Sequence, residues 1–254
     1  MKRLSKIVMG AILATAISIG IKSDVSPKIS KQQAEQKIQA AFQRACPQNI
    51  STIAYDPEFT ELETYIRKKI EHDADKETID KIVQESKKAR PGHTMGVQGF
   101  FKYIGDGQKR PVFARKELFE KSYVTTTEDI ASIIDHEDAH ADEERNGLDF
   151  YKYYMNGQET THLIRTKRFR TEIMLKIGEL GACARQLEKI YSGERNPSNA
   201  CKTDALEWLK YSIVNLETER MYSRLLPKEQ EFYEAKKKRY PKVFDTVDII
   251  TLLR

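Results

Sequence analysis

The segment His136-Glu137-Asp138-Ala139-His140 combines residue types and a spacing that suit metal chemistry. Side chains four residues apart lie on one face of a helix, so the imidazoles of His136 and His140 can bind one zinc ion. A glutamate directly after the first histidine, here Glu137, can accept a proton from a water molecule that zinc activates. Because the chain has only 5 histidines, this arrangement is improbable as a coincidence.

The residues around this segment predict a helix that carries it. Residues 125–129 read Thr-Thr-Thr-Glu-Asp, a threonine cap followed three residues later by an acid, which is typical of a helix N-terminus. Apolar residues then recur at helical spacing, beginning with Ile130. Asn146-Gly147 predicts the end of the helix, because glycine favours the left-handed cap conformation.

The same helix carries many acidic side chains. One of them could orient a zinc-binding histidine by accepting a hydrogen bond from its second ring nitrogen. Each equally suits a solvated helix face. The acids are Asp135, Asp138, Asp142, Glu143 and Glu144.

A catalytic zinc ion usually has three protein ligands and a fourth position for water, so a third ligand must come from elsewhere in the chain. The metzincin pattern requires glycine and then histidine at positions that here hold Glu143 and Asn146, which excludes that class. The H-E-x-x-H segment and the downstream Glu179-Leu180-Gly181-Ala182 instead resemble the gluzincin zinc peptidases, in which a second helix supplies a glutamate within E-x-x-A. The resemblance covers about residues 95–192 and includes the order strand, histidine helix, connecting segment, glutamate helix.

By that resemblance, Glu179 is the third ligand, the core is zincin-like, and each chain binds one zinc ion. The residues by themselves leave alternatives open. Glu172 lies two turns earlier on the same helix face. Asp149 would resemble the aspzincins, although its Gly-Leu-Asp context lacks their full signature. His162, in an expected hairpin strand, is a further alternative.

The function that the resemblance implies is zinc-dependent hydrolysis of peptide bonds, with zinc-bound water activated by Glu137. A second group usually helps to hold the oxyanion, and His162, Tyr211 and Tyr222 are candidates. The partner would be a peptide or protein substrate. The competing hypothesis is a non-catalytic helical envelope protein that acts as a binding or scaffolding module.

The pattern of elements predicts an α+β, mainly helical fold, with a small antiparallel sheet packed on the zinc-site helix and the glutamate-bearing helix. Its edge strand, 111–115, suits main-chain pairing with an extended peptide. We expect four parts: a signal peptide or N-terminal anchor, a helical region, a catalytic core and a C-terminal helical region, at 1–24, 25–90, 91–192 and 193–254.

Hydrophobic spacing and turn residues predict the individual elements. Helices are expected at 30–45, from Pro57 to Ile70, at 76–89, 168–191 and 203–226, and after Pro227. Strands are expected at 96–104 and 111–115, and a hairpin at 150–164 around Asn156-Gly157.

The N-terminus has the features of a targeting segment. Lys2, Arg3 and Lys6 precede an uncharged apolar stretch at 7–21 that ends before Lys22. This stretch is short for a membrane span and matches a positive region followed by an apolar region of a signal peptide. Cleaved export and a membrane tether through 7–21 both remain open, and either predicts a secreted, periplasmic or cell-surface protein.

Cysteines and charge add two further expectations. In an exported protein, two of Cys46, Cys183 and Cys201 are expected to form a disulfide, and the last two are closest in sequence. The net charge of +5 comes from 43 basic and 38 acidic residues and does not indicate a nucleic-acid partner. The basic run at 236–239 is interpreted as a solvated helix face.

Overall fold

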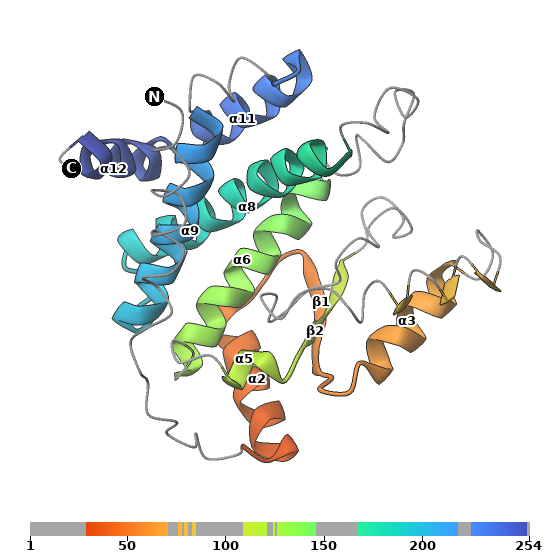
Figure 1. The fold of residues 1–254 in the computed structure, drawn as a ribbon. Coiled ribbons are helices and arrows are strands. Elements are labelled where there is room, and N and C mark those ends of the chain that lie inside the picture. The colour runs from red at the N-terminus through yellow and green to blue at the C-terminus, as the bar shows by residue number, and fades with distance from the viewer. Residues whose placement is uncertain are drawn as a thin grey trace, which may run out of the picture.

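The computed structural model describes residues 29–70, 76–77, 79–80, 83–84, 109–120, 124, 126–145, 167–217 and 225–252. Over these ranges the chain is mainly helical and contains a small parallel sheet (Figure 1). In order, the elements are α2 (Lys31–Ala45), β1 (Ile50–Tyr55), α3 (Thr60–Ile70), β2 (Arg110–Ala114), α5 (Glu117–Glu120), α6 (Thr127–Arg145), α8 (Lys167–Tyr191), α9 (Asn199–Glu217), α11 (Pro227–Arg239) and α12 (Pro241–Leu252).

Helix α6, which carries the histidines, begins where the threonine run predicted. The Asp129 backbone N–H donates to Thr126 Oγ1 at 3.1 Å, and the Thr126 N–H donates back to the Asp129 carboxylate at 2.8 Å. These reciprocal bonds satisfy two N–H groups that a helix start would otherwise leave without partners. The expected end of this helix at 146–147 lies outside the described residues.

Other helices also follow their local sequence. The prediction of a helix at 30–45 is confirmed by α2, where Ser30 and Gln33 form a capping box. The helix expected from Pro57 begins at Thr60, because the Asp56 carboxylate accepts from the backbone N–H groups of Thr60 and Leu62 at 2.8 Å each.

The C-terminal helices differ from prediction in their bounds. Helix α9 begins at Asn199, four residues before the expected start at 203. It starts there because Ser198 Oγ accepts from the Cys201 N–H at 3.3 Å. The charged helix after Pro227 is confirmed as α11, and Pro241 opens the separate helix α12.

The prediction of an antiparallel sheet is wrong for the strands that the structure describes. Strand β2 confirms the strand expected at 111–115, but it pairs in parallel with β1, a strand that the helical reading of 25–90 missed. Parallel strands need a long crossover between them, and here that crossover contains α3. The expected strand at 96–104 and the hairpin at 150–164 lie outside the described residues.

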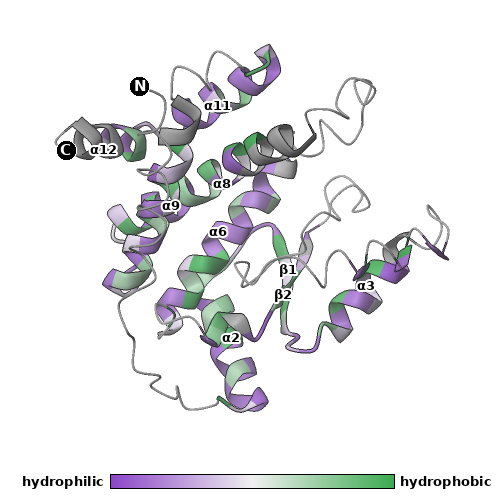
Figure 2. Cartoon of the chain, in the orientation of Figure 1, coloured by the Kyte–Doolittle hydropathy of each residue, from purple (hydrophilic) through white to green (hydrophobic). Residues whose placement is uncertain are grey.

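Three apolar clusters hold the described elements together. One joins α2, the two strands, α5 and the first half of α6, another joins α8, α9, α11 and α12, and a third packs α3 against Phe113 of β2. Helix α6 lies between α2 and α8 and contacts both (Figure 1). The helices mix hydrophilic and hydrophobic residues along their length, as expected when one side of a helix is buried (Figure 2).

None of the described helices is long and apolar enough to cross a bilayer. The apolar stretch at 7–21, expected to be a signal or tether, lies outside the described residues.

Candidate metal centre

His136, His140 and Glu179 come together where α6 and α8 cross. The Nε2 atoms of the two histidines are 3.2 Å apart. The Glu179 carboxylate places Oε2 at 3.2 Å from His136 Nε2 and Oε1 at 3.6 Å from His140 Nε2. The ligand atoms of these three residues all lie within 4.8 Å of one another.

These separations fit a zinc ion. Two ligands that are each about 2.0–2.1 Å from a tetrahedral zinc ion lie about 3.3–3.4 Å apart. The two imidazole nitrogens are 3.2 Å apart, and each lies 3.2 or 3.6 Å from a different oxygen of Glu179, which is close to that value. The three side chains are 16–25% exposed, so the centre is largely enclosed by protein but still in contact with solvent.

The helices bring these residues together because they pack antiparallel. Gln186 Nε2 donates to Ser132 Oγ at 3.0 Å in the first half of α6. One turn further along α6, His136 meets Glu179, which lies two turns back along α8. Both side chains of the Ser132–Gln186 pair are buried, so this hydrogen bond joins the two helices within the protein interior.

Cys183 contacts Nδ1 of His136, the ring nitrogen that does not face the other ligands. Its Sγ lies 3.9 Å from His136 Nδ1, the ring nitrogen that faces away from Glu179. The sequence suggested such a contact only from the acids of α6, and Cys183 was not predicted. The available signal was its spacing, because Cys183 follows Glu179 by four residues and therefore lies on the same face of α8.

Burial and neighbouring groups change the titration of this pair. Burial raises the pKa of the Cys183 thiol above its usual value, against the opposing effect of His136. The pKa of His136 is raised well above its usual value, since the sulfur of Cys183 and the carboxylate of Glu179 outweigh the opposing effect of burial.

Gly181 permits the close approach of α6 and α8 next to the centre. A Cβ atom at this position would lie 1.8 Å from Glu143 Oε1. Glu143 is buried there and accepts from Lys236 Nζ of α11 at 2.7 Å. The same Nζ donates to the Ile177 carbonyl at 2.7 Å, two residues before Glu179. Ala182, the alanine of E-x-x-A, is fully buried.

The interpretation of the basic run at 236–239 as a solvated face is wrong for Lys236. This residue is 1% exposed and paired with Glu143, whereas Arg239 is partly exposed and donates to Asp142. A charged residue is buried here because a partner from a distant helix compensates for its lost hydration, which no local pattern reveals.

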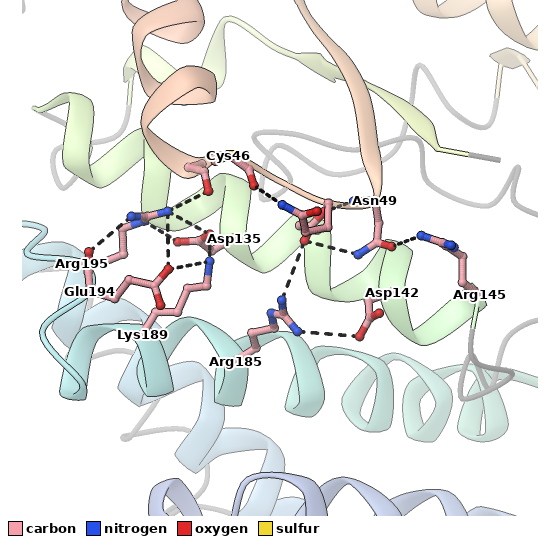
Figure 3. A network of polar contacts seen from close by, with 12 residues as sticks. Cys46, Asn49, Asp135, Asp142, Arg145, Arg185, Lys189, Glu194 and Arg195 are labelled. Carbon is pink, nitrogen blue, oxygen red and sulfur yellow. Dashed lines mark hydrogen bonds and ion pairs between the residues drawn. The ribbon is translucent and has the colours of Figure 1, made fainter. Parts of the chain in front are cut away.

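The remaining acids of α6 hold the surrounding elements (Figure 3). Asp135 is 2.7 Å from both Lys189 Nζ and Arg195 Nε, and Arg195 Nη2 also donates to the Ala45 carbonyl at 2.9 Å. Burial raises the pKa of Asp135, although the two cations oppose this shift. The Asp135 cluster therefore connects α2, α6 and the segment that follows α8.

Asn49 makes a second connection from the N-terminal region to α6. Its backbone N–H donates to Asp138 Oδ1 at 2.6 Å, and its side-chain oxygen accepts from Arg145 at 2.6 Å. Arg185 lies 4.0 Å from Asp138 and 3.7 Å from Asp142 (Figure 3). The acids near the motif thus make contacts that join elements, and the Glu144 side chain lies outside the described residues.

The structure adds no support for the alternative third ligands or for the candidate oxyanion-binding residues. The Glu172 side chain, Asp149, His162 and Tyr222 lie outside the described residues. Tyr211 is 52% exposed on α9, where its ring stands 6.0 Å from that of Trp208 and under Lys176 Nζ at 5.0 Å.

The expected disulfide is not formed. Cys46, Cys183 and Cys201 are all free thiols, the first exposed and the other two buried. Cys183 faces His136, and Cys201 lies in the first turn of α9. The closeness of two cysteines in sequence therefore did not determine what their sulfurs contact.

Comparisons of the chain with protein-family models, with curated proteins and with solved structures found no match. What the chain does must therefore be inferred from its own residues.

Proposed function

We propose that this chain is a zinc-dependent peptidase in which His136, His140 and Glu179 hold one zinc ion and Glu137 is the catalytic base. The observation that carries the proposal is the mutual approach of three ligand side chains to distances that suit tetrahedral zinc. Two neutral imidazoles and one carboxylate form a common donor set of catalytic zinc sites, which keep a further position for water.

A bound zinc ion would supply two effects, a lower pKa for a coordinated water molecule and polarisation of the scissile carbonyl. Glu137 directly follows His136 on α6, so it leaves the helix about 100° around from that ligand. From there Glu137 accepts the proton of the attacking water and passes it to the leaving amine. Glu179 contributes the negative charge that favours a divalent cation over neutral molecules at this position.

Helix α8 and its neighbours would keep the ligands in position before the metal binds. Glu179 is two residues from Gly181, whose missing side chain leaves room for Glu143 of α6, and Lys236 joins the two helices across that contact. Pre-positioned ligands reduce the cost of ordering side chains on binding.

The test is Glu137→Gln in the full chain, with zinc content and hydrolysis of a peptide library measured together. We expect about one zinc ion per chain in both proteins, and loss of at least about 100-fold in activity in the variant, the usual contribution of a general base. Glu188→Gln, an exposed position on α8, is the matched control and should retain full activity.

Full activity of Glu137→Gln would refute the proposed mechanism. Zinc at stoichiometry without cleavage of any peptide would favour a zinc-binding protein that lacks activity. If the purified chain held no stoichiometric zinc, a binding or scaffolding role in the envelope would replace the proposal.

The substrate would be a peptide or protein outside the cytoplasm, reached by export or by a tether through 7–21. This part of the proposal is tested by fractionation of cells that express the full chain, and recovery from the cytoplasm alone would refute it.

A further inference from the structure

We propose that Cys183 is a positioning residue of the zinc centre, whose sulfur accepts a hydrogen bond from His136 Nδ1–H and thereby directs His136 Nε2 to the metal. This inference rests on the proposed zinc site and adds to it a residue outside the H-E-x-x-H and E-x-x-A motifs.

The orientation of the His136 ring shows which of its nitrogens would bind the metal. Its Nε2 lies 3.2 Å from His140 Nε2 and 3.2 Å from the Glu179 carboxylate, so this nitrogen faces the metal position. The proton of a neutral imidazole that binds a metal through Nε2 must then be on Nδ1. The buried N–H needs an acceptor, because leaving one without a partner costs about 1–3 kcal/mol.

Cys183 supplies the acceptor. Its Sγ is 3.9 Å from Nδ1, which is within the range of hydrogen bonds to sulfur. The residue is 2% exposed and belongs to the well-packed cluster of α8, α9, α11 and α12, so the sulfur has little freedom to move away. Water has little access to a position this enclosed and cannot readily replace the sulfur.

The acids that could have served instead are engaged elsewhere. Asp135, next to His136 in sequence, binds Lys189 and Arg195, and Asp138 accepts from the Asn49 backbone. A carboxylate is the usual second partner of a zinc-binding histidine, and sulfur is a weaker acceptor. We therefore expect His136 to be held in orientation while the imidazole receives less added electron density than a carboxylate would give.

One helix consequently presents both groups. Glu179 and Cys183 are four residues apart on α8 and lie on one face, the first toward His136 Nε2 and the second toward Nδ1. Any shift of α8 along α6 would displace the ligand and the acceptor together, which couples the zinc affinity to the packing of these two helices.

The experiment compares zinc affinity of the full chain, measured by competition with a chromophoric chelator, for Cys183→Ala and Cys183→Ser. Loss of the acceptor in Cys183→Ala should weaken zinc binding about 10–100-fold, the usual effect of removing such a partner. Cys183→Ser keeps an acceptor and should recover most of that loss. Cys201→Ala also removes a buried thiol and should bind zinc as the wild type does, because the sulfur next to His136 Nδ1 is that of Cys183.

A second readout distinguishes positioning from coordination and from packing alone. In the cobalt-substituted wild type we expect no thiolate-to-cobalt charge-transfer band. In the zinc-loaded protein, the His136 Nδ1–H proton should give a slowly exchanging resonance that is lost in Cys183→Ala and kept in Cys183→Ser.

Equal zinc affinity of Cys183→Ala and the wild type would overturn this inference and leave the proposed function intact. Binding by Cys183→Ser as weak as that of Cys183→Ala would also overturn it, because packing would then explain the loss. A thiolate-to-cobalt band would show direct ligation and would overturn the positioning role. If the wild type bound no zinc, the proposed function would fail and this inference with it.

Discussion

Replacing Gly181 with alanine should destabilise the protein, although the same change usually stabilises a helix. In a helix interior, alanine is favoured over glycine by about 1 kcal/mol. Here the added Cβ would lie 1.8 Å from Glu143 Oε1, 2.8 Å from its carboxyl carbon and 3.2 Å from Lys236 Cδ. A real Cβ keeps at least 3.0 Å from such atoms, so Oε1 must move by at least 3.0 − 1.8 = 1.2 Å.

We expect that displacement to disturb the ion pair of Glu143 with Lys236. The bond to Lys236 Nζ is made by the other carboxylate oxygen, Oε2, at 2.7 Å, and because the buried carboxylate moves as a unit, a shift of this size leaves two buried charges poorly paired. Breaking a buried ion pair costs about 3–5 kcal/mol. Subtracting the gain in helix propensity of about 1 kcal/mol leaves an expected loss of about 2–4 kcal/mol in unfolding free energy.

Gly178→Ala is the matched control on the same helix. Nothing lies within 4 Å of a Cβ at that position, so the variant should be more stable than the wild type by about 0.5–1 kcal/mol. Both variants can be measured by urea unfolding followed by far-UV circular dichroism.

The cause is tested by repeating Gly181→Ala in a Glu143→Ala background. With the carboxylate removed, the new Cβ has space, and the substitution should become neutral or stabilising. A Gly181→Ala protein as stable as Gly178→Ala would refute the close contact of α6 and α8, and an unchanged loss in the Glu143→Ala background would refute its assignment to Glu143.

Three further outcomes are expected. Lys236→Met leaves Glu143 buried without its cation and should lower the unfolding free energy by about 3–5 kcal/mol, whereas Lys238→Met at an exposed position should change it by less than about 0.5 kcal/mol; equal urea midpoints would contradict the pairing. Burial raises the pKa of Cys201 from 9.0 to about 12, so its neutral thiol stabilises the fold below pH 9 and this contribution is lost as the pH rises toward 12. Stability curves of the wild type and Cys201→Ala should therefore converge or cross over that window, and parallel curves would show that the thiol does not contribute. Removing zinc with a chelator should lower the melting temperature, since a ligand at 100 times its Kd stabilises by about 2.7 kcal/mol. A melting temperature that changes with neither zinc nor chelator would argue against a bound metal.

The parts of this protein that depend on neighbours along the chain are predictable from its sequence. Thr126 and Asp129 cap α6 through atoms three residues apart, and Ser30 and Gln33 do the same for α2. The placement of His136 and His140 on one face is also local, because it follows from the period of the helix.

Contacts between distant segments needed the tertiary structure. The approach of Glu179 to His136 depends on the antiparallel packing of α6 and α8. The E-x-x-A motif suggests this approach, but the periodicity of each helix contains no information on the distance between the two helices. The parallel pairing of β1 and β2 depends on where the segment between the strands brings the chain back to the sheet. Side chains alternate with a two-residue period in parallel and antiparallel strands alike, so the sequence pattern does not distinguish the two.

The same distinction applies to the charges. The sequence alone gives the charge and the type of each residue. It therefore predicts that Lys236 lies on a solvated helix face and that Cys183 is a candidate for a disulfide with Cys201. Tertiary packing decides that Lys236 is buried against Glu143 and that Cys183 faces His136. The physical reason is that the free energy of a buried polar group depends on which partners surround it, and those partners come from helices far apart in the chain.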